Sequence, residues 1–243
     1  MRRFLFALIF LYVFLPLSSQ QKVSFYSDDS LKITADLYLK DINLPFILLF
    51  HQGNSSRGEF AEIAVRLMKL NYNCLAVDLR SGDKINYTMN ETARRATNEG
   101  YESSMISASR DIKAALNYVQ KYNGKPSVLF GSSYSASLCL LEAAGNEQVK
   151  AVVAMSPGEY FRPDVIVKNN IGKISQPMFV SATRLENDFI LEMLADVPEE
   201  NIHYFLPSRG RGDHGAKMLW KTSESSSQCW LELMLFFKKI RYD

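Results

Sequence analysis

The sequence predicts a single α/β domain in which a mostly parallel sheet is covered by helices on both faces. Short apolar segments of strand character alternate with amphipathic segments of helical character along the chain. Residues 46–50 (FILLF) and 149–155 (VKAVVAM) are almost unbroken apolar runs, which is typical of strands buried on both faces. The chain has 243 residues, of which 47% are hydrophobic and 22% charged, and this suits one domain with a sizeable core.

The first half of the chain predicts an antiparallel hairpin followed by strand, helix and strand. Residues 22–39 alternate apolar and polar side chains on both sides of a polar turn, which indicates the hairpin. The strand at 46–50 precedes a helix with apolar positions at i, i+3, i+4 and i+7. These positions are Phe60, Ile63, Ala64 and Leu67. Residues 72–79 form the next strand, and we expect residues 81–100, which are polar and aperiodic, to be irregular.

The second half of the chain continues the alternation of strands and helices. The first element is a helix, whose apolar face is marked by Ile112, Leu116 and Val119. Further strands are predicted at 127–130, 149–155, 177–182 and 201–207. Helices are predicted at 135–145, at 187–197 and at the C-terminus, the last with a stripe of Trp230, Leu233, Met234 and Phe237. The segment 158–176 has room for a loop or a short helix but not for a large lid.

Residues 1–20 have the pattern of a secretory signal peptide. Arg2 and Arg3 precede an apolar run at 4–17, and small or polar residues follow it. The run is shorter than the roughly 20 residues that a membrane-spanning helix needs, which disfavours an uncleaved anchor. We therefore expect export to a periplasmic or secreted location, a mature domain at 21–243 and no stable membrane insertion after cleavage.

Charge and cysteine content exclude several classes of function. Removal of Arg2 and Arg3 leaves 26 basic against 26 acidic residues, without the basic clusters that nucleic-acid binding requires. Cys74, Cys139 and Cys229 are too few and too far apart for a disulfide framework, so we expect buried apolar side chains. The sequence has no metal-ligand spacing and no phosphate-binding loop, so neither metal nor cofactor is expected, and it carries no signal for an oligomeric state.

A serine stands where the strand at 127–130 turns into a helix. A sharp strand-to-helix turn brings neighbouring backbones together and requires small residues two positions before and two after its apex. Gly131 and Ser135 occupy those positions, which places Ser133 at the apex with its hydroxyl above the sheet. This is the G-x-S-x-G nucleophile elbow with Ser135 in place of the second glycine. The segment predicts Ser133 as a nucleophile, although such small-residue turns also have purely structural roles.

A serine nucleophile needs a general base, and the chain has three histidines. His51 precedes the nucleophile, and His203 lies in an alternating strand, where we expect it to pack. In folds with this elbow, the chain order is serine, acid, histidine. Only His214, in a glycine-containing loop after the last predicted strand, fits that order.

The remaining groups of the site are expected directly after strands. The acid should follow the strand at 177–182, where Glu186 is the first choice and Asp188 the alternative, unless Asp188 caps the next helix. The oxyanion formed in acyl transfer needs backbone N–H donors. The residue after the nucleophile, Tyr134, supplies one, and the loop after 46–50 supplies the other from Gly53 or Gln52.

With these residues in place, the chain resembles a single-domain α/β hydrolase of the lid-poor, dienelactone-hydrolase-like branch, and in particular exported bacterial members with a GSSYSA elbow. The resemblance covers nearly the whole mature chain through LLFHQGNSSRGEF, CLAVDLRSG, LFGSSYSASL, AMSPGEYF and DHGAKMLW. It implies Ser133 as nucleophile and His214 as base. The segment TRLEND departs from the usual glycine-then-aspartate spacing, so the resemblance supports Glu186 less directly. Dienelactone hydrolases use a cysteine where this chain has Ser133, so their substrate is not implied.

The predicted function is a serine hydrolase that cleaves a small or soluble carboxylic ester through an acyl-enzyme intermediate. Its partner is a small-molecule acyl substrate. Tyr134, Tyr160 and Phe161 either line an aromatic pocket or simply pack in the fold. Arg209 and Arg211 either attract an anionic substrate or are solvated surface residues. The alternatives are an acyltransferase with the same residues and a catalytically inactive family member that binds ligands.

Overall fold

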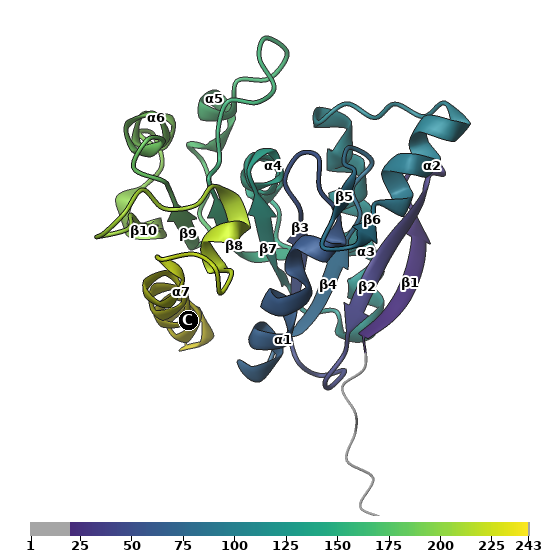
Figure 1. Ribbon diagram of the computed structural model, residues 1–243, viewed down its shortest axis with the longest axis horizontal. Coiled ribbons are helices and arrows are strands. Elements are labelled where there is room, and N and C mark those ends of the chain that lie inside the picture. Colours follow the sequence, from purple (N-terminus) through teal and green to yellow (C-terminus); the bar gives the residue numbers. More distant parts are fainter. Residues whose placement is uncertain (1–19, 243) are drawn as a thin grey trace, which may run out of the picture.

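The computed structural model describes residues 20–242 and shows a central eight-stranded sheet covered by helices (Figure 1). The strand order is β1-β2-β4-β3-β7-β8-β9-β10. β1 (Gln20–Tyr26) pairs antiparallel with β2 (Lys32–Tyr38), which pairs antiparallel with β4 (Asn73–Val77). β4 and the remaining strands are mutually parallel: β3 (Phe46–Phe50), β7 (Ser127–Ser132), β8 (Val149–Met155), β9 (Met178–Ser181) and β10 (Ile202–Phe205). The predicted fold class is confirmed, and the expected signal segment lies outside the described residues apart from Gln20.

The helices form one layer on each face of the sheet. One face is covered by α1 (Ala61–Lys69) and α7 (Ser226–Tyr242), and the other by α3 (Ser109–Asn123), α4 (Tyr134–Ala143), α5 (Val167–Ile171) and α6 (Asn187–Met193). Because successive strand residues point to opposite faces, the apolar run of β3 serves both layers. Ile47 and Leu49 pack in the layer of α1 and α7, whereas Leu48 and Phe50 pack in the opposite layer. This explains why β3 is apolar at every position.

Four short 3₁₀ helices lie in the connections of the described chain. They are η1 (Arg57–Phe60), η2 (Ile106–Ala108), η3 (Glu199–Asn201) and η4 (Gly215–Leu219). Two of them, η1 and η4, follow the loops at the carboxyl ends of β3 and β10. Within residues 20–242, no helix combines the length and apolar character that a membrane span requires.

The prediction of an irregular segment at 81–100 was wrong. It contains β5 (Lys84–Ile85), β6 (Thr88–Met89) and α2 (Glu91–Glu99). The Asn90 side chain caps α2 by accepting the Ala93 N–H, and Gly100 ends the helix with φ 76°. The buried positions of α2 are the small residues Thr92, Ala93 and Ala96, so the helix shows no apolar stripe in the sequence.

The expected apolar stripe of α7 is correct except at one position. Trp230, Leu233 and Phe237 are buried, but the Met234 side chain is 43% exposed. Cys229, Phe236 and Ile240 complete the buried face instead. All three cysteines of the chain are buried and unpaired, as their apolar surroundings predicted.

Candidate active site

Ser133 lies at a strained turn between β7 and α4. Its φ of 60° and ψ of −124° are unfavourable for any residue with a side chain. The Ser133 N–H donates to the Met155 carbonyl at 2.8 Å, which fixes the turn to β8. A Cβ atom on Gly131 would lie 2.4 Å from the Cα of Ala136, so only glycine fits at that position. The backbone therefore has the form of the predicted elbow, with Ser133 at its apex.

Ser135 is compatible with the position that glycine occupies in the standard motif. Its hydroxyl accepts the Ser132 N–H at 2.9 Å and donates to the Phe50 carbonyl at 2.7 Å. The extra side chain therefore connects the elbow to the carboxyl end of β3, where the loop 51–56 begins. Ser135 is fully buried and has a structural role.

Glu186 and His214 form a hydrogen-bonded pair. The Nδ1–H of His214 donates to Oε1 of Glu186 at 2.5 Å. Oε2 of Glu186 accepts the Thr183 N–H at 2.9 Å and the Ser156 hydroxyl at 2.8 Å. Burial acts to raise the pKa of Glu186, but the hydrogen bonds from His214, Thr183 and Ser156 outweigh it and lower the pKa to about 2. Glu186 is therefore a carboxylate at neutral pH.

Among the described residues, no hydrogen bond or ion pair joins Asp188 to His214. It is exposed, and its carboxylate accepts from the side chain of the adjacent Asn187 at 2.8 Å. The alternative expectation that Asp188 caps α6 was wrong, because Glu186 is the N-cap residue and no side chain makes a capping hydrogen bond. Of the two carboxylates considered, the structure brings Glu186 to the histidine.

The loop that carries His214 packs against the elbow. The Ala216 N–H donates to the Ser132 hydroxyl at 2.9 Å, and the Gly215 N–H donates to the Ser156 hydroxyl at 3.0 Å. Gly215 has φ 66°, and a Cβ atom there would lie 2.4 Å from the Ser132 hydroxyl oxygen. The close approach of this loop to the residue preceding Ser133 therefore requires glycine.

The Ser133 hydroxyl donates to the hydroxyl of Tyr160 at 3.2 Å. The Tyr160 hydroxyl in turn donates to the Ser156 carbonyl at 3.3 Å. Within residues 20–242, no hydrogen bond joins Ser133 to His214. Burial raises the pKa of Tyr160, so its phenol is neutral and remains a donor at neutral pH.

Only one of the three candidate pocket aromatics faces the nucleophile. Tyr160 contacts Ser133 and is 39% exposed. Tyr134 and Phe161 are buried, and the Tyr134 hydroxyl donates to the Ser81 carbonyl, so both rings pack inside the fold. The candidate anion-attracting residues Arg209 and Arg211 are exposed.

The candidate oxyanion donors are the backbone N–H groups of Tyr134 and of the loop after β3. Tyr134 is the first residue of α4, so its N–H has no partner within the helix. Gln52 N–H donates to the Glu59 carboxylate at 3.0 Å, whereas Gly53 N–H makes no hydrogen bond within the described chain. This geometry favours Gly53 over Gln52 as the second donor.

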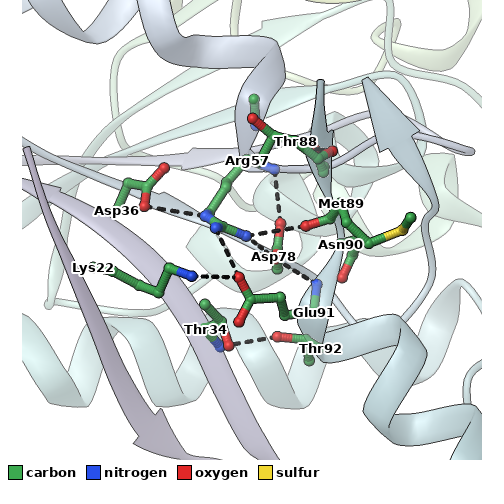
Figure 2. Close-up of polar contacts among 12 residues, drawn as sticks. Lys22, Thr34, Asp36, Arg57, Asp78, Thr88, Met89, Asn90, Glu91 and Thr92 are labelled. Carbon is green, nitrogen blue, oxygen red and sulfur yellow. Dashed lines mark hydrogen bonds and ion pairs between the residues drawn. The ribbon is translucent and has the colours of Figure 1, made fainter. Parts of the chain in front are cut away.

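A buried charge cluster holds the loop that contains Gly53 (Figure 2). Arg57, in η1, pairs with Asp78 at 2.5 Å, Asp36 at 3.1 Å and Glu91 at 3.0 Å. Its backbone N–H also donates to Asp78 at 2.8 Å. These partners come from β2, from the end of β4 and from α2, so Arg57 fixes the loop after β3 to three other elements.

The other two histidines have structural roles. His51 is fully buried; its Nδ1–H donates to the Gln52 carbonyl at 2.8 Å and its Nε2 accepts the Leu79 N–H at 3.0 Å. Burial lowers the pKa of His51, which keeps the ring neutral. His203 bonds to Glu232 at 2.9 Å and stacks on Phe179, as expected for a packing residue.

Sequence reasoning missed Ser156, Glu59 and Arg57. Ser156 is the first residue after β8, and a polar residue directly after a strand at the carboxyl edge of the sheet was an available signal. Glu59 and Arg57 act through neighbours that are distant in sequence, and no local motif marks them. Among the described residues, no cluster of three or more His, Cys, Asp or Glu side chains could hold a metal ion.

Neither a protein-family model nor a curated protein sequence matches the chain, whereas solved structures match it over most of its length. The esterase Pf2001 of Pyrococcus furiosus has 17% identity and a TM-score of 0.65, covering 91% of each chain. A dienelactone hydrolase from Anabaena variabilis has 16% identity and a TM-score of 0.68, covering 91% of this chain and 97% of that one. The α/β hydrolase GrgF from Penicillium sp. has 13% identity and a TM-score of 0.71, covering 92% of this chain and 99% of that one. The chain thus has an α/β-hydrolase fold, which it shares with dienelactone hydrolases among other proteins.

Proposed function

We propose that the protein is a serine hydrolase that cleaves small or soluble carboxylic esters through an acyl-enzyme intermediate. The observation that carries the proposal is the hydrogen-bonded pair of Glu186 and His214. The loop that contains His214 packs against the strained turn of Ser133. Serine, acid and base follow one another in the chain order that this fold uses. The similar structures include an esterase and a dienelactone hydrolase, and this supports ester hydrolysis as the reaction class.

In the proposed reaction, the Ser133 oxygen attacks the ester carbonyl while His214 Nε2 takes the hydroxyl proton. Glu186 holds the imidazole by Nδ1 and stabilises the imidazolium. The N–H groups of Tyr134 and Gly53 bind the oxyanion. His214 then returns the proton to the departing alcohol. In the second half, a water molecule, deprotonated by His214, attacks the acyl carbonyl; the bond between the acyl carbon and Ser133 Oγ breaks, His214 returns the proton to Ser133, and the acid leaves. Because the Ser133 hydroxyl donates to Tyr160 in the structure, it must turn from Tyr160 to His214 before attack.

The surroundings of the site favour a small substrate. The segment after β8 contains only the five-residue helix α5, too short for a large lid. A pocket of about 430 Å³ lies between this segment and α6, and its lining combines charged with apolar side chains. These are Glu159, Arg162, Lys168, Phe189, Glu192 and Met193. None of these residues is Ser133, Glu186 or His214, so the proposal of a small substrate rests on the short segment after β8 and not on this pocket.

The test is a panel of soluble esters, thioesters and amides assayed on the wild type and on Ser133→Ala. A fluorophosphonate probe should label the wild type and fail to label Ser133→Ala, while Ser132→Ala and Ser135→Ala still react. Ester turnover should fall by about 10⁴-fold or more in Ser133→Ala, because triad members act as a unit. Labelling that persists in Ser133→Ala would contradict the assignment of the nucleophile.

Two alternatives predict different outcomes in the same panel. An acyltransferase would transfer the acyl group to an added alcohol or amine faster than to water. An inactive member of the family would bind esters without Ser133-dependent turnover. The presence of a paired acid and base beside Ser133 favours catalysis over binding alone.

We further propose that residues 1–20 direct export and are removed. The support is the charge and hydropathy pattern of the segment, which resembles a signal peptide. Mass spectrometry of the exported protein should find a new N-terminus near Gln20 or Gln21. An intact chain beginning at Met1 in the membrane fraction would contradict the proposal.

A further inference from the structure

Ser156 has a backbone conformation that a serine adopts only when its surroundings impose it. It directly follows β8 and has φ 54°, in the left-handed region that favours glycine. The residue is fully buried, and its N–H donates to the Ser181 carbonyl at 2.9 Å. A strained residue at the carboxyl edge of the sheet, next to the candidate active site, indicates a role for its side chain.

The Ser156 hydroxyl joins the acid to the loop of the base. It donates to Oε2 of Glu186 at 2.8 Å and accepts the Gly215 N–H at 3.0 Å, so both capacities of the hydroxyl are used. The Gly215 N–H belongs to the residue after His214. One oxygen atom therefore contacts both the carboxylate and the backbone beside the imidazole.

We propose that Ser156 is a positioning residue that orients the Glu186 carboxylate toward His214. The inference rests on the proposed hydrolase function. A carboxylate held only through Oε1 can rotate away from the imidazole. The Ser156 hydroxyl and the Thr183 N–H hold Oε2, which fixes the plane of the carboxylate and leaves Oε1 for the Nδ1–H of His214. Outer hydrogen bonds of this kind preserve the orientation of groups that act directly.

Ser132 provides a matched comparison. It is also fully buried, and its hydroxyl accepts the N–H of the next residue in the same loop, Ala216, at 2.9 Å. Among the described residues, however, Ser132 makes no hydrogen bond to Glu186. Removing either hydroxyl weakens the attachment of the His214 loop, but only the loss of the Ser156 hydroxyl affects the carboxylate.

The test compares Ser156→Gly, Ser156→Ala and Ser132→Ala. Glycine suits φ 54°, so Ser156→Gly should remove the hydroxyl and keep the fold, even where Ser156→Ala is unstable. We expect kcat on a soluble ester to fall by about ten- to hundredfold in Ser156→Gly with little change in KM, the usual cost of losing an outer hydrogen bond. The loss should exceed that of Ser132→Ala at least threefold. In a Glu186→Gln background, Ser156→Gly should cost no further activity.

A spectroscopic measurement separates this inference from the proposed function. The Nδ1 proton of His214 should give a far-downfield proton NMR signal in the wild type, because it is donated to a carboxylate. Ser156→Gly should shift or broaden that signal and Ser132→Ala should change it less, whether or not the protein hydrolyses any ester. An unchanged signal in Ser156→Gly, or the same loss of activity with and without Glu186, would overturn the inference. Turnover that survives Ser133→Ala would instead contradict the proposed function.

Discussion

At the scale of single residues, two neighbouring carboxylates have very different surroundings. Glu186 accepts hydrogen bonds from His214, Thr183 and Ser156, whereas Asp188 is exposed and, among the described residues, accepts only from Asn187. The difference arises because Glu186 lies at the N-cap of α6 and faces the carboxyl edge of the sheet, while Asp188 lies in the first turn and faces solvent.

Replacing each carboxylate by its amide should therefore have unequal effects on turnover. Glu186→Gln keeps the size of the side chain but removes the charge that stabilises the imidazolium and offers an amide that also suits the wrong tautomer of His214. We expect kcat to fall by about 10²- to 10⁴-fold. Asp188→Asn should stay within about twofold, as surface substitutions usually do. Ester hydrolysis at saturating substrate measures both, and the reverse ranking would assign the acid to Asp188.

Glu186 should also contribute to the pH dependence of stability. Its folded-state pKa, about 2, is lower than the ordinary value of 4.5, so the ionised group favours the folded state. This contribution is fully present above pH 4.5 and is lost as the pH falls toward 2. Urea unfolding of the wild type and Glu186→Gln should therefore show a stability difference that is constant near neutrality and moves against the wild type below pH 4.5. A difference independent of pH down to 2.5 would contradict the low pKa.

Some residues of the site could be predicted from the sequence and others could not, for physical reasons. Ser133 is marked by the small residues that its turn requires, and Glu186 and His214 by their places after strands. Ser156 also directly follows a strand, but its role could not be predicted, because its hydroxyl acts on groups 30 and 59 positions away in the chain. The choice between Gly53 and Gln52 likewise depended on Glu59, whose carboxylate binds Gln52 only in the folded chain.

At the scale of elements, the loop after β3 is held by buried charge rather than by apolar packing. Arg57 contacts Asp36 in β2 and Asp78 at the end of β4, and the exposed fractions of these three side chains are 7% or less. Both carboxylates depend on one guanidinium for their compensation. The position of Gly53, four residues before Arg57, therefore depends on an ion cluster that the local sequence does not reveal.

Removing Arg57 should be strongly destabilising. Arg57→Met leaves Asp36 and Asp78 buried without their partner, and we expect a loss of about 3–5 kcal/mol in the free energy of unfolding. Arg110→Met is the control, because Arg110 forms an exposed pair with Asp28 and should change stability little. Urea denaturation measures both variants. Equal, small effects would show that the cluster contributes little to holding the loop.

Helices and strands could be predicted from the sequence where large apolar side chains cover either one face or both faces of the element. β3 and β8 appear as apolar runs because both of their faces are covered, and α1 appears as a stripe because only one of its faces is. α2 was not predicted, because the residues that pack it against the sheet are small and form no apolar stripe. Asn90 and Gly100 nevertheless mark its ends. Met234 was placed wrongly because α7 turns Phe236 and Ile240 toward the core instead.

At the scale of the whole molecule, the parallel strands position the residues of the candidate site. β3, β7, β8, β9 and β10 all end at the same edge of the sheet, and each is followed by a segment that contains one of the candidate site residues: Gly53, Ser133, Ser156, Glu186 and His214. The antiparallel strands β1 and β2 lie at the end of the strand order opposite β10, and none of these residues follows them directly (Figure 1). The strained turn at Ser133 lies at the end of β7, which has parallel partners on both sides.

This arrangement predicts a gradient of stability across the sheet, which hydrogen exchange can measure. Every residue of β3 and β7 is buried, and both strands have hydrogen-bonded neighbours on each side, so their amides should exchange only when the whole domain unfolds. β1 is an edge strand with mostly exposed residues, and its amides should exchange faster through local opening. Ser133→Ala should preserve this order, because it removes the hydroxyl and leaves the turn and its strands in place. If β7 exchanged as fast as β1, the elbow would lack the rigid support that its strained backbone requires, and the geometry of the site would have to depend on bound substrate.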